Sequence, residues 1–174
     1  DYWVAQFQNI QPLPLDFPAG EPTWASLRAV SAVLPVAETQ MLLQQAPAAY
    51  DTQINDLLLT ALLQTFAGWT QEQNLLIELE GHGREPLEQL SVTSFDLSHS
   101  VGWFTTAYPL RLTCDTDDLG TLIQSVKRQL RQVPNRGLGY GILRYLQQEP
   151  RLASFAPCRS SLIISVNLTR QQPV

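Results

Sequence analysis

The chain has 174 residues, of which 44% are hydrophobic and 16% charged, and this balance is typical of one globular domain with a sizeable core. Its net charge is -5, and the lack of a lysine and arginine cluster argues against nucleic acid or an anionic membrane surface as a partner. No apolar run approaches the roughly 20 residues that span a bilayer and no signal peptide is recognisable, so we expect a cytoplasmic protein that binds no membrane.

The sequence offers few metal ligands. Cys114 and Cys158 are far apart and form no C-x-x-C or Cys/His spacing, and His82 and His99 do not stand at a ligand spacing from each other. We therefore expect no metal site and no disulfide bond. The two cysteines are interpreted as isolated, buried thiols.

The first part of the chain predicts a helix, a connector and a strand. Asp1 can cap a short helix over residues 2–8, and a run of prolines makes residues 9–23 an extended connector. A helix that begins at the first residue suggests a chain cut from a longer protein. Residues 24–34 alternate in a way that fits a strand ending before Pro35.

The middle of the chain predicts two helices and a buried strand. Residues 38–44 are helical, and a stronger helix follows a cap at Asp51 or Thr52 and ends near Gly68. Its core face would consist of Ile54, Leu57, Leu58, Ala61, Leu62 and Phe66. The apolar run over residues 75–79, followed by glycine, predicts a buried strand.

The last part continues the alternation of strands and helices. The second half of residues 101–112 alternates like a strand, and Asp117 or Asp118 caps a helix that stops at Pro134. A glycine-rich link at residues 134–141 leads to a short helix at residues 142–147, and residues 161–168 predict a final strand. This pattern places the chain in the α/β class, as a single domain over residues 1–174.

Residues 80–85 concentrate ionisable groups directly after the buried strand. Because sites in α/β sheets form at the ends of such strands, Glu80 is the first candidate for chemistry. Gly81 and Gly83 permit a sharp turn, and His82 between them is typical of an orienting hydrogen-bond partner. The alternative is an ordinary polar turn after a strand.

Other motifs point away from common enzyme classes. The link at residues 137–141 follows a helix and lacks a Lys-Ser/Thr pair, so it predicts a tight turn anchored by Tyr140 rather than a phosphate loop. Ser98 and Ser100 flank His99, but no G-x-S-x-G elbow exists, which argues against a hydrolase. Trp103 and Phe104 are candidates for a pocket or, more commonly, for core packing.

Four strings, in this order, resemble motifs of the epimerization domain of nonribosomal peptide synthetases, a relative of the condensation domain. Residues 56–61 are similar to its DxLLxA helix, residues 80–85 read EGHGRE, and residues 134–141 match PxxGxGYG. Residues 99–112 are similar to RTVGWFTxxYPxxL, with His99 and Ser100 at the two positions that differ. The EGHGRE string favours epimerization over condensation.

The resemblance covers only the second half of such a domain. The first half carries an HHxxxDG motif, and this sequence contains no His-His pair. In the final motif, FNYLGQ, Asn167 is kept and Leu168 replaces the tyrosine. The resemblance thus implies one chloramphenicol-acetyltransferase-like lobe, a mixed sheet flanked by helices, with a substrate tunnel between this lobe and a missing N-terminal lobe.

The implied reaction inverts the α-carbon of an aminoacyl or peptidyl thioester, which needs an acid/base group on each face of a planar intermediate. Glu80 resembles the family's glutamate for one face, whereas the histidine for the other face belongs to the missing lobe. The chain alone is therefore expected to be inactive. Asn167 and His82 would bind the developing oxyanion or position the substrate.

The implied substrate is carried on the phosphopantetheine of a peptidyl carrier protein, and the chain itself would bind no cofactor. Trp103, Phe104, Tyr108 and Tyr140 are candidates for the tunnel or the lobe junction. If they are exposed in the isolated lobe they would favour self-association, and if they fill its own core they would not.

Two alternatives remain at this point. A condensation or acyltransferase half-domain would use the same fold to form amide bonds. A non-catalytic interaction module would dock a carrier protein, and His99, Ser100 and Leu168 support it because they depart from the motifs.

Overall fold

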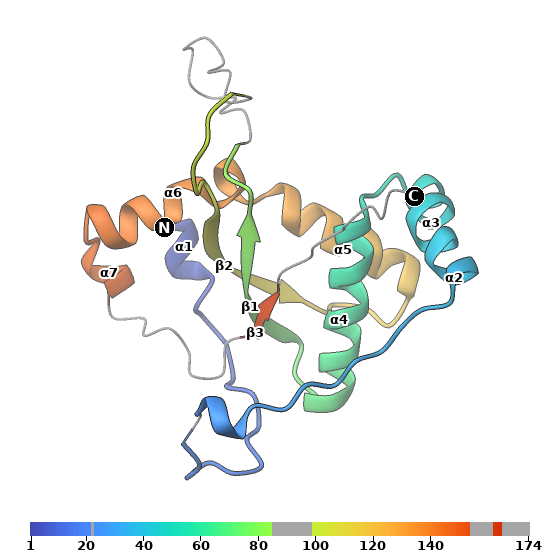
Figure 1. The fold of residues 1–174 in the computed structure, drawn as a ribbon, viewed down its shortest axis with the longest axis horizontal. Coiled ribbons are helices and arrows are strands. Elements are labelled where there is room, and N and C mark those ends of the chain that lie inside the picture. Colours follow the sequence, from blue (N-terminus) through green and yellow to red (C-terminus); the bar gives the residue numbers. More distant parts are fainter. Residues whose placement is uncertain (22, 85–98, 154–161, 165–174) are drawn as a thin grey trace.

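The computed structural model describes residues 1–21, 23–84, 99–153 and 162–164. A mixed sheet with the strand order β2-β1-β3 forms its centre (Figure 1). The central strand β1 (Asn74–Gly81) pairs antiparallel with β2 (Thr106–Thr113) and parallel with β3 (Leu162–Ile164). The α/β class and the three strands predicted over these residues are confirmed.

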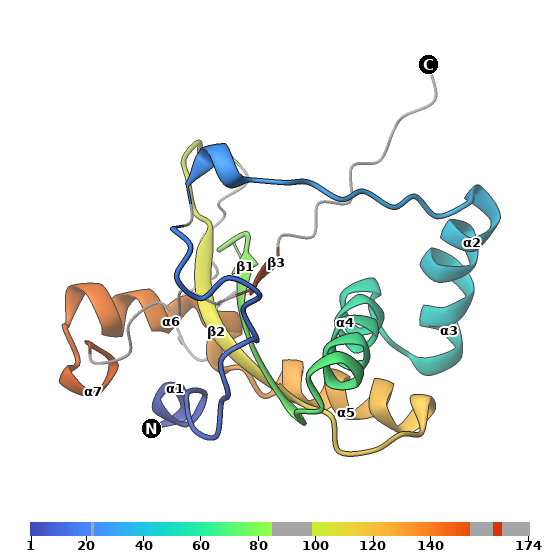
Figure 2. The same ribbon diagram turned by 90° about the horizontal axis from the view of Figure 1, so that it is seen from below.

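Helices flank the sheet on two sides. Beside β2 lie α1 (Tyr2–Ala5) and α6 (Leu138–Gly141), whereas α4 (Ile54–Thr70) and α5 (Leu119–Arg131) lie next to each other on the other side (Figure 1). At one end of the molecule is α7 (Pro150–Ala153), and at the opposite end are α2 (Val36–Gln40) and α3 (Ala46–Tyr50) (Figure 2). Shorter helical stretches lie at Trp24–Ser26, Met41–Gln45, Pro134–Gly137 and Ile142–Leu146.

One hydrophobic cluster joins the sheet to its helices. Side chains of β1 alternate along the strand, so that Leu75, Ile77 and Leu79 are buried while Glu80 is exposed. The cluster collects the buried residues Trp3, Leu59, Leu63, Leu75, Ile77, Leu79, Tyr108, Leu110, Leu112, Leu122, Val126, Val133, Tyr140 and Leu152.

Two glutamine side chains cover the outer edge of β2. The backbone N–H of Arg111 donates to Oε1 of Gln6 at 2.9 Å, and that of Thr113 donates to Oε1 of Gln129 at 2.9 Å. Pro109 has no N–H to offer at the same edge. The strand therefore presents few free donors to another chain.

The leading helix is part of the core rather than an appendage. Trp3 is only 6% exposed, and its ring lies 6.0 Å from that of Tyr108 and 5.3 Å from that of Tyr140. Instead of capping the helix, the Asp1 carboxylate accepts a hydrogen bond from Nη1 of Arg151 at 2.7 Å. The helix ends at Ala5, three residues before the predicted end.

The strand predicted over residues 24–34 is wrong. Trp24–Ser26 forms one 3-10 turn, and residues 27–35 contain no regular element and contact no strand. Trp24 is 91% exposed and Val30 is 98% exposed. The alternating pattern fits a strand, but a strand also needs a partner backbone, and the described part of the chain offers none.

The long helix differs from its prediction at both ends. Asp51 has a positive φ of 51° at the end of α3, and α4 begins only after Gln53 and passes Gly68 to end at Thr70. Its most buried leucines are Leu57, Leu59 and Leu63, so Ala61 is exposed and the other predicted core residues are half-buried. Apolar residues occur nearly all round this helix, which is why periodicity misplaced the buried face.

The C-terminal part agrees better with its prediction. Asp118 caps α5 by accepting the backbone N–H of Thr121 at 2.8 Å. The glycine-rich link makes a turn with positive φ at Asn135, Arg136 and Gly137, and helix α6 then starts earlier than predicted. Cys114 is half-buried rather than buried, and Cys158 lies outside the described residues.

Candidate functional site

Glu80 lies at the end of the central strand with its side chain exposed. It is paired with Ala107 of β2, and the following Gly81 is paired with Thr106. Its neighbours Leu79 and Tyr108 point into the core, so Glu80 points to the other face of the sheet. A carboxylate in this place is anchored by a rigid strand and reaches solvent.

The turn after Glu80 is tightly packed against the segment that leads into β2. Gly83 has a φ of +68°, and a Cβ atom at this position would lie 1.7 Å from the carbonyl oxygen of Phe104. Only glycine fits such an approach. The backbone N–H of Arg84 donates to Nδ1 of His82 at 3.1 Å, so the neutral ring carries its proton on Nε2.

Arg84 contacts the same segment with its side chain. Nη2 donates to the carbonyl oxygen of Ser100 at 2.9 Å, and Cζ lies 4.3 Å from the centre of the Phe104 ring. The sequence motif contains Arg84, but the motif alone gave it no role. A glycine-flanked arginine together with a downstream Trp-Phe pair was the signal that could have found this contact.

The predicted aromatic candidates separate into two groups. Trp103 is 90% exposed and Phe104 is half-buried against Arg84, so the preference for core packing is wrong for Trp103. Tyr108 and Tyr140 are 8% and 5% exposed and belong to the core cluster, which removes their rings from the free surface. Tyr140 anchors the glycine-rich link as predicted, and burial raises the pKa of its hydroxyl.

Some predicted site residues cannot be placed. Asn167, Leu168 and Glu85 lie outside the described residues. His99 is exposed, next to Ser100. The structure therefore brings together Glu80, His82, Arg84 and Phe104 at one end of β1, and the contribution of Asn167 stays a prediction.

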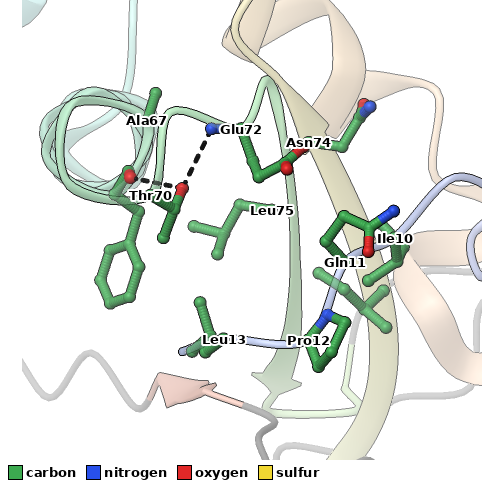
Figure 3. A pocket seen from close by; sticks show the side chains of 11 residues that line it. Ile10, Gln11, Pro12, Leu13, Ala67, Thr70, Glu72, Asn74 and Leu75 are labelled. Atoms are coloured by element: carbon green, nitrogen blue, oxygen red, sulfur yellow. Dashed lines mark hydrogen bonds between the residues drawn. The ribbon is translucent and has the colours of Figure 1, made fainter. Parts of the chain in front are cut away.

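The described residues contain no group of three or more histidine, cysteine or acidic side chains that could hold a metal ion. A small cavity of about 30 Å³ lies where the connector, the end of α4 and the start of β1 meet, at the strand end remote from Glu80 (Figure 3). It is too small for a substrate, and the Thr70 hydroxyl beside it is engaged with Phe66 and Glu72. Of the helices in the described ranges, none could span a membrane.

Relatives of this chain are large peptide-synthesising proteins. A linear gramicidin synthase protein of Brevibacillus parabrevis is 43% identical over 173 residues, which is 98% of this chain and 2% of that protein. Chondramide synthase cmdD of Chondromyces crocatus is 48% identical over 143 residues, 82% of this chain and 4% of that protein. The chain thus spans a few per cent of the length of these curated relatives.

Solved structures show the same fold. The epimerization domain from the third module of tyrocidine synthetase B is 35% identical with a TM-score of 0.73, covering 89% of this chain and 35% of that one. The first condensation domain of the CDA synthetase is 13% identical with a TM-score of 0.52, covering 72% of this chain and 25% of that one, and shows the fold alone.

The family model of the condensation domain matches residues 1–172. Together with the sheet order, the flanking helices and the motif strings, this match confirms the lobe architecture expected from the sequence. The chain belongs to the condensation-domain family of nonribosomal peptide synthetases.

Proposed function

We propose that this chain is the C-terminal lobe of an epimerization domain, which inverts the α-carbon of an aminoacyl or peptidyl thioester. The substrate would be attached to the phosphopantetheine of a peptidyl carrier protein. The observation that carries the proposal is the exposed Glu80 at the end of β1, within a string that reads EGHGRE in full.

The geometry of the strand end supports a role for Glu80 in proton transfer. Its carboxylate would remove the α-proton from one face of the substrate, and the electron pair of the C–H bond would move onto the thioester carbonyl oxygen. A protonated group of the other lobe would then deliver a proton to the opposite face of the planar intermediate. Nε2–H of His82 is a suitable donor for positioning substrate oxygens, and the same is proposed for Asn167.

The similarity to the tyrocidine synthetase epimerization domain also supports the proposal, since it is the solved relative with sequence identity well above that of the condensation domain compared with it. The chain covers 35% of that domain, so a second lobe is part of the proposal rather than of the described structure.

The test uses the complete protein and a carrier-bound aminoacyl thioester in deuterated solvent. We expect deuterium at the α-carbon and a mixture of both configurations in the released product. The 174-residue chain by itself should catalyse no such exchange, because Glu80 faces only one side of the substrate. Amide formation without exchange would favour a condensation domain, and neither reaction would favour a non-catalytic carrier-docking module.

A further inference from the structure

Arg84 connects the end of β1 to the segment that enters β2. Its guanidinium donates from Nη2 to the carbonyl oxygen of Ser100, which is 16 positions away in the sequence, at 2.9 Å. The same guanidinium lies over the Phe104 ring with 4.3 Å between Cζ and the ring centre. One side chain therefore makes two contacts of different chemistry with one segment.

The backbone around Arg84 reinforces this connection. The turn at Gly83 approaches the Phe104 carbonyl so closely that no side chain fits between them. The backbone N–H of Arg84 holds His82 by its Nδ1 atom. A movement of Arg84 would therefore move both the His82 ring and the segment that carries Phe104.

These contacts lie next to Glu80. Because Gly81 is paired with Thr106 and Glu80 with Ala107, the segment containing Ser100 and Phe104 enters the sheet directly opposite the proposed catalytic group. Any change in the relation between the turn and this segment would alter the surroundings of the Glu80 carboxylate.

We infer that Arg84 is a positioning residue that fixes the Glu80 end of β1 through Ser100, Phe104 and His82, and this inference rests on the proposed function. A planar guanidinium places its face on an aromatic ring while its N–H groups donate in the plane. A lysine ammonium is a point charge and cannot keep both contacts in this geometry. Misplacement of a reacting group by about 1 Å lowers rates by about 10².

The experiment measures inversion by the complete protein with Arg84→Lys, Arg84→Gln, Phe104→Leu and the double variant Arg84→Gln/Phe104→Leu. Arg128→Gln, which changes an exposed arginine of α5, is the matched control. We expect both Arg84 variants to lose about 10- to 100-fold in kcat with little change in KM, and the control to behave as wild type. Since Arg84 and Phe104 share one contact, the double variant should be no slower than Arg84→Gln.

A purely structural role would lower the thermal midpoint and the fraction of active protein while kcat per active site stayed at the wild-type value. That result, a fully active Arg84→Lys, or multiplicative losses in the double variant would each overturn the inference. If the wild-type protein inverts no substrate, the proposed function fails, and the four variants are compared by their unfolding midpoints. Non-additive midpoint shifts would then support the Arg84–Phe104 coupling, and additive shifts would overturn it.

Discussion

The guanidinium of Arg131 donates two parallel hydrogen bonds to the carboxylate of Asp56, at 3.1 Å to Oδ1 and 2.9 Å to Oδ2. Asp56 is in the first turn of α4 and also accepts the backbone N–H of Gln53 at 2.8 Å. Its side chain is 1% exposed, whereas that of Arg131 is 46% exposed. The pair therefore joins the start of α4 to the end of α5 with one partner buried and the other in contact with water.

This asymmetry predicts that the two halves of the pair are not equivalent. Arg131→Met should lower the free energy of unfolding by about 3 kcal/mol, because it leaves a buried carboxylate without its counter-charge. Asp56→Asn should have a smaller effect, since Arg131 can turn to solvent and asparagine can still accept from Gln53. Urea unfolding followed by circular dichroism compares the two, and equal losses would contradict the prediction.

Gly137 should tolerate no side chain. Its φ is +92°, and a Cβ atom would lie 1.9 Å from Cδ1 of the buried Tyr108 ring. Gly137→Ala should lower the free energy of unfolding by about 3 kcal/mol or more through strain and overlap. Gly139→Ala is the control, because nothing lies within 4 Å of its added Cβ and alanine favours a helix. Similar melting temperatures for the two variants would show that the Tyr108 contact is misplaced.

The N-terminal cap of α5 should make stability depend on pH. Hydrogen bonds from the side chain and the backbone of Thr121 hold the pKa of the Asp118 carboxyl below its ordinary value. Because the folded pKa is the lower one, the stabilisation is present above the unfolded pKa and is lost as the pH falls below about 4.

Thermal melts at pH 7 and pH 3 test this dependence. Asp118→Ala should lower the melting temperature at pH 7 and shrink the difference between the two pH values. Asp117→Ala, the same change at the neighbouring exposed residue, should keep the wild-type difference. A wild-type pH difference in Asp118→Ala would argue against the cap.

Glu80→Gln should keep the fold and lose most of the inversion in the complete protein. The change preserves volume but removes the proton acceptor, and losses of about 10² to 10⁴ are typical of acid/base groups. Chiral analysis of the released product measures the rate. Glu72→Gln, at an exposed position before the other end of β1, is the control. Near-wild-type inversion by Glu80→Gln would reduce Glu80 to a residue of the turn.

The isolated chain should self-associate through exposed apolar side chains. Val101 and Trp103 are 101% and 90% exposed, and Val30 and Val33 are 98% and 92% exposed, whereas Tyr108 contributes nothing because it is buried. Sedimentation velocity should show a mass that rises with concentration. Trp103→Ser should weaken this association more than Trp69→Ser, whose indole is partly covered by Phe66. A monomer at every concentration would contradict the prediction.

Local patterns in the sequence determined much of the outcome. The apolar run before Glu80 gives β1, and the Asp118 cap with its amphipathic repeat gives α5, because both depend on residues within one element. The motif strings likewise identified the family and Glu80 without any knowledge of contacts. The same strings also contained the glycines whose backbone conformations shape both turns.

Tertiary structure decided which of these residues are covered and by what. Gln6 meets Arg111 across 105 positions and Asp56 meets Arg131 across 75, and no local pattern encodes such pairs. Trp103 and Tyr108 are both aromatic, yet one is exposed and the other buried, because only Tyr108 lies under Trp3 and Gly137. Periodicity is set by neighbours in the chain, whereas burial and strand pairing require a partner surface that the folded chain must bring from elsewhere.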